Sequence, residues 1–210
     1  MTEQDIRVLL VELAASLFAR GYSVGSAGNI SVRLANGYLM TPTNSSLGRL
    51  DPDRLSKLDP DFRHIGGDKP SKEVFMHRAF YQARNDAGAV VHLHSTHATA
   101  VSCLPDVDAA NPLPPLTPYF VMRIGRRMPI IPYYRPGDSA MEPAINTAAR
   151  DARAVLLANH GPVVSGDTLT DAVYAAEELE EAAKLFLMIR GHSPRLLSGS
   201  QVDDLLETFG

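Results

Sequence analysis

The feature that most constrains the fold of this chain is the alternation of short apolar runs with longer amphipathic segments. Residues 89–94 and 153–158 are short and apolar, which indicates buried strands. Residues 72–84 and 167–190 carry apolar residues at helical spacing, which indicates helices. The sequence contains no internal repeat and no interdomain linker. We therefore predict one α/β domain over residues 1–210, with a mixed central sheet and helices packed on both faces.

The same patterns predict the remaining elements. They are a helix over 5–20 that ends at Gly21, a hairpin over 30–41 that turns at Asn36-Gly37, helices over 97–104 and 138–151, and an edge strand over 128–132. Ser71 is the expected N-cap of the helix over 72–84. The five prolines of residues 105–118 predict a long irregular connection, a kind of segment that is often functional in a compact domain.

Composition excludes several classes of protein. The net charge is −4, and no basic stretch interleaved with aromatic residues is present, so we expect no nucleic-acid partner. No apolar run approaches the roughly 20 residues that a membrane-spanning helix needs. The start, Met1 to Asp5, is acidic where a secretory signal would be basic. Cys103 is the only cysteine, so no internal disulfide can form. We expect a cytoplasmic protein without a membrane partner.

Three histidines predict a metal site. His92 and His94 lie two residues apart on an apolar strand, so they point to the same face with their α-carbons roughly 6–7 Å apart. The alternative is that one histidine is buried and hydrogen-bonded while the other is incidental, but burying two imidazoles without a partner is costly. His160 ends a second apolar strand. Three histidines with an open fourth position are typical of catalytic zinc, so we predict one Zn²⁺ per chain, or another divalent metal.

The other four histidines receive different interpretations. We interpret His64, His77 and His192 as surface residues. His97 lies one helical step beyond the His92–His94 pair. The more ordinary interpretation gives it no catalytic role, and the alternative is a contact with the substrate or with a metal ligand.

Three polar loops predict an anion site. Residues 25–31, 43–48 and 68–72 are rich in glycine and in hydroxyl or amide side chains, and the last loop also carries Lys72. Such loops can surround a phosphate with N–H and O–H donors, although ordinary turns share this composition. Glu73 follows the third loop, in the expected first helical turn, where the helix dipole alone would favour a carboxylate. We expect a small phosphorylated substrate.

Four motifs in order resemble the class II aldolase/adducin family, which includes fuculose-phosphate aldolase and ribulose-phosphate 4-epimerase. They are Gly25-Ser26-Ala27-Gly28-Asn29-Ile30-Ser31, Lys69-Pro70-Ser71-Lys72-Glu73, His92-Leu93-His94 and Asn159-His160-Gly161. The resemblance runs from about residue 5 to residue 190. Within the family the chain is most similar to 3-oxo-tetronate 4-phosphate decarboxylases, by Thr41-Pro42-Thr43 and by the stretches 67–73, 116–123 and 132–138.

The resemblance implies roles that spacing does not show. It makes His92, His94 and His160 the zinc ligands and Glu73 the acid/base, which also touches the metal when no substrate is bound. Four residues match positions near the phosphate pocket: Asn29, Thr43, Ser71 and Lys72. Family members are usually homotetramers with the active site at a subunit interface, and Tyr119 is the candidate to act across it.

The implied activity is zinc-dependent decarboxylation of 3-oxo-tetronate 4-phosphate to dihydroxyacetone phosphate and carbon dioxide, through a metal-stabilised enediolate. Two alternatives stay open. A sugar-phosphate aldolase or 4-epimerase would use the same metal, base and phosphate pocket. A non-catalytic scaffold like the adducin head domain is more distant, because such a domain would be expected to lose metal ligands and this chain has all three histidines.

Overall fold

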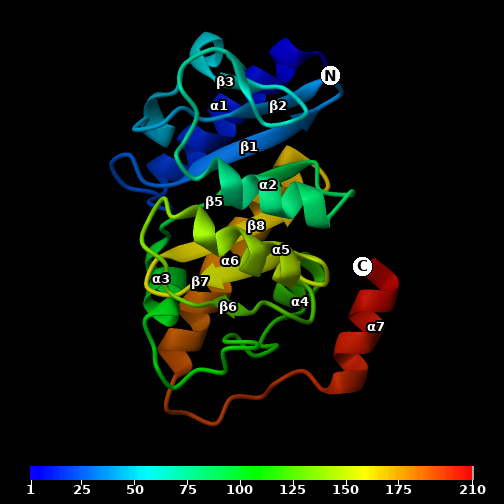
Figure 1. Cartoon of the computed structure of the whole chain (residues 1–210). Coiled ribbons are helices and arrows are strands. Elements are labelled where there is room, and N and C mark those ends of the chain that lie inside the picture. The colour runs from blue at the N-terminus through cyan, green and yellow to red at the C-terminus, as the bar shows by residue number, and fades with distance from the viewer. Residues whose placement is uncertain (210) are drawn as a thin grey trace.

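The computed structural model describes residues 1–209, and one eight-stranded sheet runs through them in the order β4-β3-β2-β1-β5-β8-β7-β6 (Figure 1). The strands are β1 Asn29–Leu34, β2 Gly37–Met40, β3 Ser56–Leu58, β4 His64–Gly66, β5 Ala89–His92, β6 Ile130–Ile131, β7 Ala154–Leu157 and β8 Gly161–Gly166. β6 and β7 are parallel, and every other pair of neighbours is antiparallel. The sheet is therefore mixed, as predicted.

Helices cover both faces of this sheet. The α-helices are α1 Glu3–Ala19, α2 Val74–Ala83, α3 Thr96–Ser102, α4 Pro118–Ile124, α5 Glu142–Ala149, α6 Leu169–Ile189 and α7 Gly199–Phe209. Three short 3₁₀ helices are η1 Leu47–Arg49, η2 Pro52–Arg54 and η3 Ser139–Met141. Within the described residues, no helix is both long and apolar enough to cross a membrane.

Strand alternation divides the core into two layers. In β5, Ala89 and Val91 belong to the apolar cluster that includes residues of α1, α3, α4 and α6, whereas Val90 belongs to the cluster with α2 and α5. In β7, Leu156 and Val155 divide in the same way. The predicted α/β fold with helices on both faces is confirmed. α7, red in Figure 1, lies outside these layers and contacts α4.

Two predicted boundaries near the histidines need correction. The strand predicted over 89–94 ends at His92, so His94 lies beyond it. The helix predicted over 72–84 begins at Val74, and its N-cap is Glu73 rather than Ser71. The hydroxyl of Ser71 accepts a hydrogen bond from the backbone N–H of Glu73 at 3.2 Å, so it stabilises the turn before the helix.

Five strands and α-helices were not predicted, and β8 matters most for the site. Gly161-Pro162 suggested only an abrupt turn, yet both residues belong to a strand between β5 and β7. Pro162 sits near the start of β8, where a proline is tolerated, and its carbonyl accepts a hydrogen bond from the N–H of Leu93 at 3.3 Å. α4, β3 and β4 were missed because they are short, whereas α7 was missed although Val202, Leu205, Leu206 and Phe209 have helical spacing.

Candidate active site

Three histidine rings meet where β5 ends and β8 begins. His92 is the last residue of β5, His94 follows two residues later, and His160 lies in the turn between β7 and β8. The Nε2 atom of His94 lies 3.1 Å from that of His92 and 3.0 Å from that of His160. The three residues form a group that could hold a divalent metal ion.

Two glycines allow the backbone to close around this cluster. Gly28 has a φ of +78°, and a Cβ added there would lie 2.8 Å from the carbonyl oxygen of His92. Gly161 has a φ of +155°, and a Cβ there would collide with the carbonyl oxygen of Leu93. Both residues therefore lie against the segment that carries the first two histidines, where a larger residue would push the strands apart.

The three imidazoles are held in the neutral form that binds metal. Burial lowers the pKa of His92 well below its ordinary value, and the neighbouring histidines add to this effect. Burial is also the main reason that the pKa values of His94 and His160 are lowered. The Nδ1 of His92 lies 2.8 Å from the carbonyl oxygen of Pro162, which can only accept a hydrogen bond. Nδ1 therefore carries the proton, and Nε2 presents its lone pair to the cluster.

A carboxylate lies beside the cluster. Oε2 of Glu73 is 3.6 Å from Nε2 of His92, and Oε1 is 3.7 Å from Nε2 of His160. Its side chain is mostly buried at the N-terminus of α2, with 15% of its surface exposed. The side-chain amide of Asn29 donates a hydrogen bond to Oε2 at 2.8 Å. This arrangement can exchange a proton with a bound molecule or supply a further metal ligand.

The three predicted anion loops line one cavity with the carboxylate. The cavity has a volume of about 260 Å³, and its lining residues are Ser26, Ala27, Gly28, Asn29, Pro42, Thr43, Asn44, Ser71, Lys72, Glu73, His94, Pro136 and Gly137. The N–H of Thr43 donates to the carbonyl of Lys69 at 2.9 Å, which ties the second loop to the third. The cavity thus joins donors suited to a phosphate with a candidate acid/base and one histidine of the cluster. Pro136 and Gly137 were not predicted as site residues.

His77 was missed as a site residue. It was predicted to lie on the surface, but it is fully buried on α2, one helical turn after Glu73. Its Nε2 atom lies 2.5 Å from the side-chain oxygen of Asn29. The i, i+4 spacing from Glu73 and the apolar residues around it in the sequence are the signals that could have found it. The surface predictions for His64 and His192 are confirmed.

His97 and Tyr119 lie apart from the cavity. Nδ1 of His97 is 2.8 Å from Oε1 of Glu180, a buried residue of α6 that also accepts the backbone N–H groups of His97 and Ala98. Tyr119 lies on α4 with 64% of its surface exposed. Neither residue lines the cavity.

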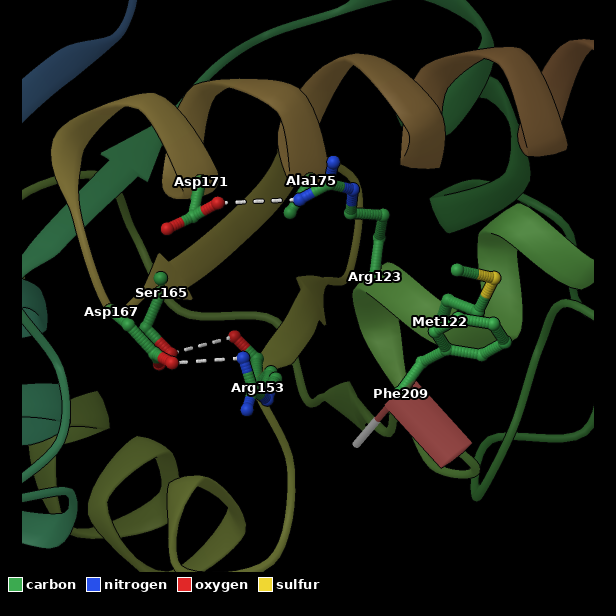
Figure 2. A pocket seen from close by; sticks show the side chains of 9 residues that line it. Met122, Arg123, Arg153, Ser165, Asp167, Asp171, Ala175 and Phe209 are labelled. Carbon is green, nitrogen blue, oxygen red and sulfur yellow. Dashed lines mark hydrogen bonds and ion pairs between the residues drawn. The ribbon is translucent and has the colours of Figure 1, made fainter. Parts of the chain in front are cut away.

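A second cavity, of about 210 Å³, lies where α7 approaches α4 and α6 (Figure 2). Arg123 pairs with Asp171 at 3.3 Å, and Arg153 pairs with Asp167 at 3.4 Å. Figure 2 shows Phe209 closing one side of this cavity. Both arginines already have carboxylate partners, and no histidine lines the cavity, so it lacks the metal ligands of the first one.

Comparisons with known proteins agree with this geometry. The family model of the class II aldolase and adducin N-terminal domain matches residues 8–187. The 3-oxo-tetronate 4-phosphate decarboxylase of Haemophilus influenzae is 50% identical over 206 residues, which cover 98% of each chain. The enzyme of the same name from Escherichia coli K12 is 49% identical over 97% of this chain and 96% of its own. The L-fuculose phosphate aldolase of Methanocaldococcus jannaschii is 37% identical over 85% and 93%.

Among solved structures, too, an L-fuculose phosphate aldolase is less similar than the first match. The structure of YgbL, described as a putative aldolase/epimerase/decarboxylase from Escherichia coli, matches with a TM-score of 0.93 and 48% identity over 97% of this chain and 98% of that one. An L-fuculose 1-phosphate aldolase matches with a TM-score of 0.88 and 27% identity, covering 98% and 96%.

Proposed function

Because the chain belongs to the class II aldolase and adducin family, we propose that it is a zinc-dependent decarboxylase that converts 3-oxo-tetronate 4-phosphate into dihydroxyacetone phosphate and carbon dioxide. The observation that carries this proposal is the meeting of three neutral histidines, one carboxylate and three donor-rich loops at one cavity. The near-full-length identity to decarboxylases, 47–50% over most of the chain, supports the choice of reaction.

His92, His94 and His160 would hold the metal, and Glu73 would approach it as a further ligand before substrate arrives. The donor set of three imidazole nitrogens suits zinc better than calcium or magnesium, which prefer oxygen. When bound, the divalent ion would act as a Lewis acid that stabilises the negative charge developing on the ketone of the substrate.

Glu73 would complete the reaction as the general acid. Breaking the bond to the carboxylate releases carbon dioxide and leaves its electron pair on the substrate as an enediolate. Glu73, protonated from solvent as the substrate binds, then delivers its proton to the carbon that lost the carboxylate, which gives dihydroxyacetone phosphate. The hydrogen bond from Asn29 holds one oxygen of Glu73, and the other oxygen remains to carry the proton.

The phosphate would bind at the loop side of the cavity. Asn29, Thr43 and Ser71 offer short polar donors, and the ammonium group of Lys72 adds positive charge. Anchoring the phosphate there would leave the reacting carbons to extend toward His94 and Glu73, which line the same cavity. Binding of this remote group would therefore position the bond that breaks.

A homotetramer would complete the site. Tyr119 is exposed and does not line the cavity of its own subunit, so its ring is free to contact the active site of a neighbouring subunit. We include this role of Tyr119 in the proposal.

A sugar-phosphate aldolase or 4-epimerase is the second candidate, favoured by the 37% identity to an L-fuculose phosphate aldolase. An aldolase forms the same enediolate by releasing an aldehyde in place of carbon dioxide. A non-catalytic scaffold is disfavoured because Glu73 and all three histidines are present.

The test is to incubate the metal-loaded protein with 3-oxo-tetronate 4-phosphate of both C2 configurations and, separately, with fuculose 1-phosphate and ribulose 5-phosphate. Carbon dioxide and dihydroxyacetone phosphate from the first compound support the proposal. Cleavage or epimerisation of a sugar phosphate, with no carbon dioxide from either oxo acid, would establish the second candidate.

A further inference from the structure

A chain of hydrogen bonds runs from Glu73 into the core behind the cavity. Nδ2 of Asn29 donates to Oε2 of Glu73 at 2.8 Å, and Oδ1 of Asn29 lies 2.5 Å from Nε2 of His77. Nδ1 of His77 lies 2.7 Å from the hydroxyl oxygen of Ser31, which lies 2.9 Å from that of Tyr81. The chain joins Glu73, the N-cap of α2, and two residues of that helix, His77 and Tyr81, to Asn29 and Ser31 of β1.

Every member of this chain behind Glu73 is buried. His77 has no exposed surface, Ser31 is 1% exposed, Tyr81 3% and Asn29 4%. Bulk water therefore cannot replace a lost partner, and an unpaired polar atom there would cost roughly 1–3 kcal/mol. Each group must satisfy its hydrogen bonds within the chain.

This requirement fixes the direction of each bond. Since a carboxylate oxygen accepts, Asn29 must present its amide nitrogen to Glu73 and its oxygen to His77. The ring of His77 must then carry its proton on Nε2, which leaves Nδ1 to accept a hydrogen bond from the hydroxyl of Ser31. Tyr81 donates in turn to Ser31. Burial lowers the pKa of His77 to about 3, so the ring is neutral, and the directions of these hydrogen bonds select one tautomer.

We propose that His77 is a positioning residue for the reaction: it holds the side-chain amide of Asn29, and through it the carboxyl group of Glu73, in the orientation that delivers the proton. This inference rests on the proposed acid/base role of Glu73. His77 does not line the cavity and therefore acts only through Asn29. The nearest alternative is a buried histidine that merely fills space between α2 and β1.

The tautomer of His77 can be measured without any assay of activity. Nitrogen NMR of histidine-labelled protein, assigned by comparison with His77→Gln, should show a neutral ring protonated at Nε2 with slow exchange of that proton. A ring protonated at Nδ1, or charged at pH 7, would overturn the proposal. In either state Nδ1 could not accept the hydrogen bond from Ser31.

Kinetics separates positioning from packing through two substitutions of the same residue. In His77→Phe a ring of similar size keeps the space filled but removes the donor to Asn29, so kcat should fall by about 10–100-fold. In His77→Gln the side-chain amide can still donate to Asn29, so kcat should recover by at least about fivefold over the phenylalanine variant. KM should change less than kcat in both, because Asn29 is one of four residues proposed to bind the phosphate, whereas it donates the hydrogen bond that holds Glu73.

Tyr81→Phe is the matched control, since it removes a hydroxyl from the same helix and the same buried chain but leaves the bond between His77 and Asn29. Its kcat should stay within about threefold of the parent. Metal content and thermal unfolding are measured for all three variants. Equal kcat for the phenylalanine and glutamine variants, a change confined to KM, or a loss of metal that accounts for the loss of rate would each overturn the inference.

Failure of the proposed function gives a different pattern. If the parent protein releases no carbon dioxide, or if Glu73→Gln remains fully active, the reaction or the role of Glu73 is wrong. The tautomer measured by NMR still decides whether His77 orients Asn29. A variant that does not fold leaves the NMR result and the other substitution to decide.

Discussion

The Nε2 atoms of His94 and His160 lie 3.0 Å apart although the two residues are separated by 66 positions in the chain. Two neutral imidazoles in such contact can share at most one proton, and the Nε2 atom of a third, His92, lies 3.1 Å from that of His94. A cation that accepts the three nitrogen lone pairs would remove the repulsion between them, which is why the cluster is a candidate metal site.

We predict one divalent metal ion, chiefly zinc, per chain in protein purified without chelators. His94→Ala should lower the metal content by at least about tenfold and abolish turnover, because two remaining histidines form a poor zinc site. His64→Ala, at an exposed histidine of β4, is the control and should retain the metal. Elemental analysis measures both variants. Full activity in metal-free protein would contradict the prediction.

Glu73→Gln should reduce kcat by about 10²–10⁴-fold while the fold and metal content are kept. The glutamine oxygen can still accept the hydrogen bond from Asn29, so the change removes chiefly the capacity to transfer a proton. Glu12→Gln, at an exposed position of α1, should have no effect. Single-turnover kinetics measures the chemical step. A variant that retains more than about a third of the parental rate would assign the acid/base role to another group.

Removing the phosphate, or its proposed partners, should damage catalysis as well as binding. Unphosphorylated 3-oxo-tetronate should show a kcat/KM at least about 100-fold lower than the phosphorylated compound, because remote binding positions the reacting carbon. Ser71→Ala and Lys72→Ala should weaken use of the phosphorylated compound only. Lys184→Ala on α6 is the control, since it lies outside this cavity. Equal kcat/KM for both compounds would mean that the loops are ordinary turns.

His77 should make the stability of the protein fall at acidic pH. Burial, with a smaller effect from His92, lowers the pKa of His77 to about 3, while in the unfolded chain it is about 6.5. Below pH 6.5 the unfolded state therefore binds a proton that the folded state does not, and the free energy of unfolding decreases as pH falls. Between pH 6.5 and 5 this group should remove about 2 kcal/mol.

Urea unfolding of the parent and of His77→Gln, at matched metal saturation, measures this difference. The parent should lose about 2 kcal/mol more than the variant between pH 6.5 and 5. His192→Gln, at an exposed histidine, should follow the parent. Parallel curves for the parent and His77→Gln would contradict the burial of a neutral histidine.

The sequence predicted a mixed sheet and the meeting of His92, His94 and His160. Both predictions depend on local signals, namely the spacing of apolar residues and the positions where strands end. It did not predict β8, whose Gly161-Pro162 start has the composition of a turn, although this strand brings His160 beside β5. It also placed His77 on the surface.

The error at His77 has a physical reason. Whether a histidine is exposed or buried depends on hydrogen-bond partners that come from elsewhere in the chain. Here they are Asn29 and Ser31, both more than 40 positions away in the sequence. The apolar residues around His77 and its i, i+4 spacing from Glu73 indicate a buried position on α2, but they do not identify these two partners.

The most direct test of the central claim follows 3-oxo-tetronate 4-phosphate, labelled with carbon-13 at its carboxyl group, by NMR in deuterated water. We predict that the label appears entirely as carbon dioxide and bicarbonate. Unlabelled dihydroxyacetone phosphate should form in equal amount, with one deuterium on the carbon that lost the carboxylate. Glu73→Gln should slow both products together. Label that stays in the oxo acid, while the same preparation cleaves fuculose 1-phosphate, would contradict decarboxylation and identify the enzyme as an aldolase.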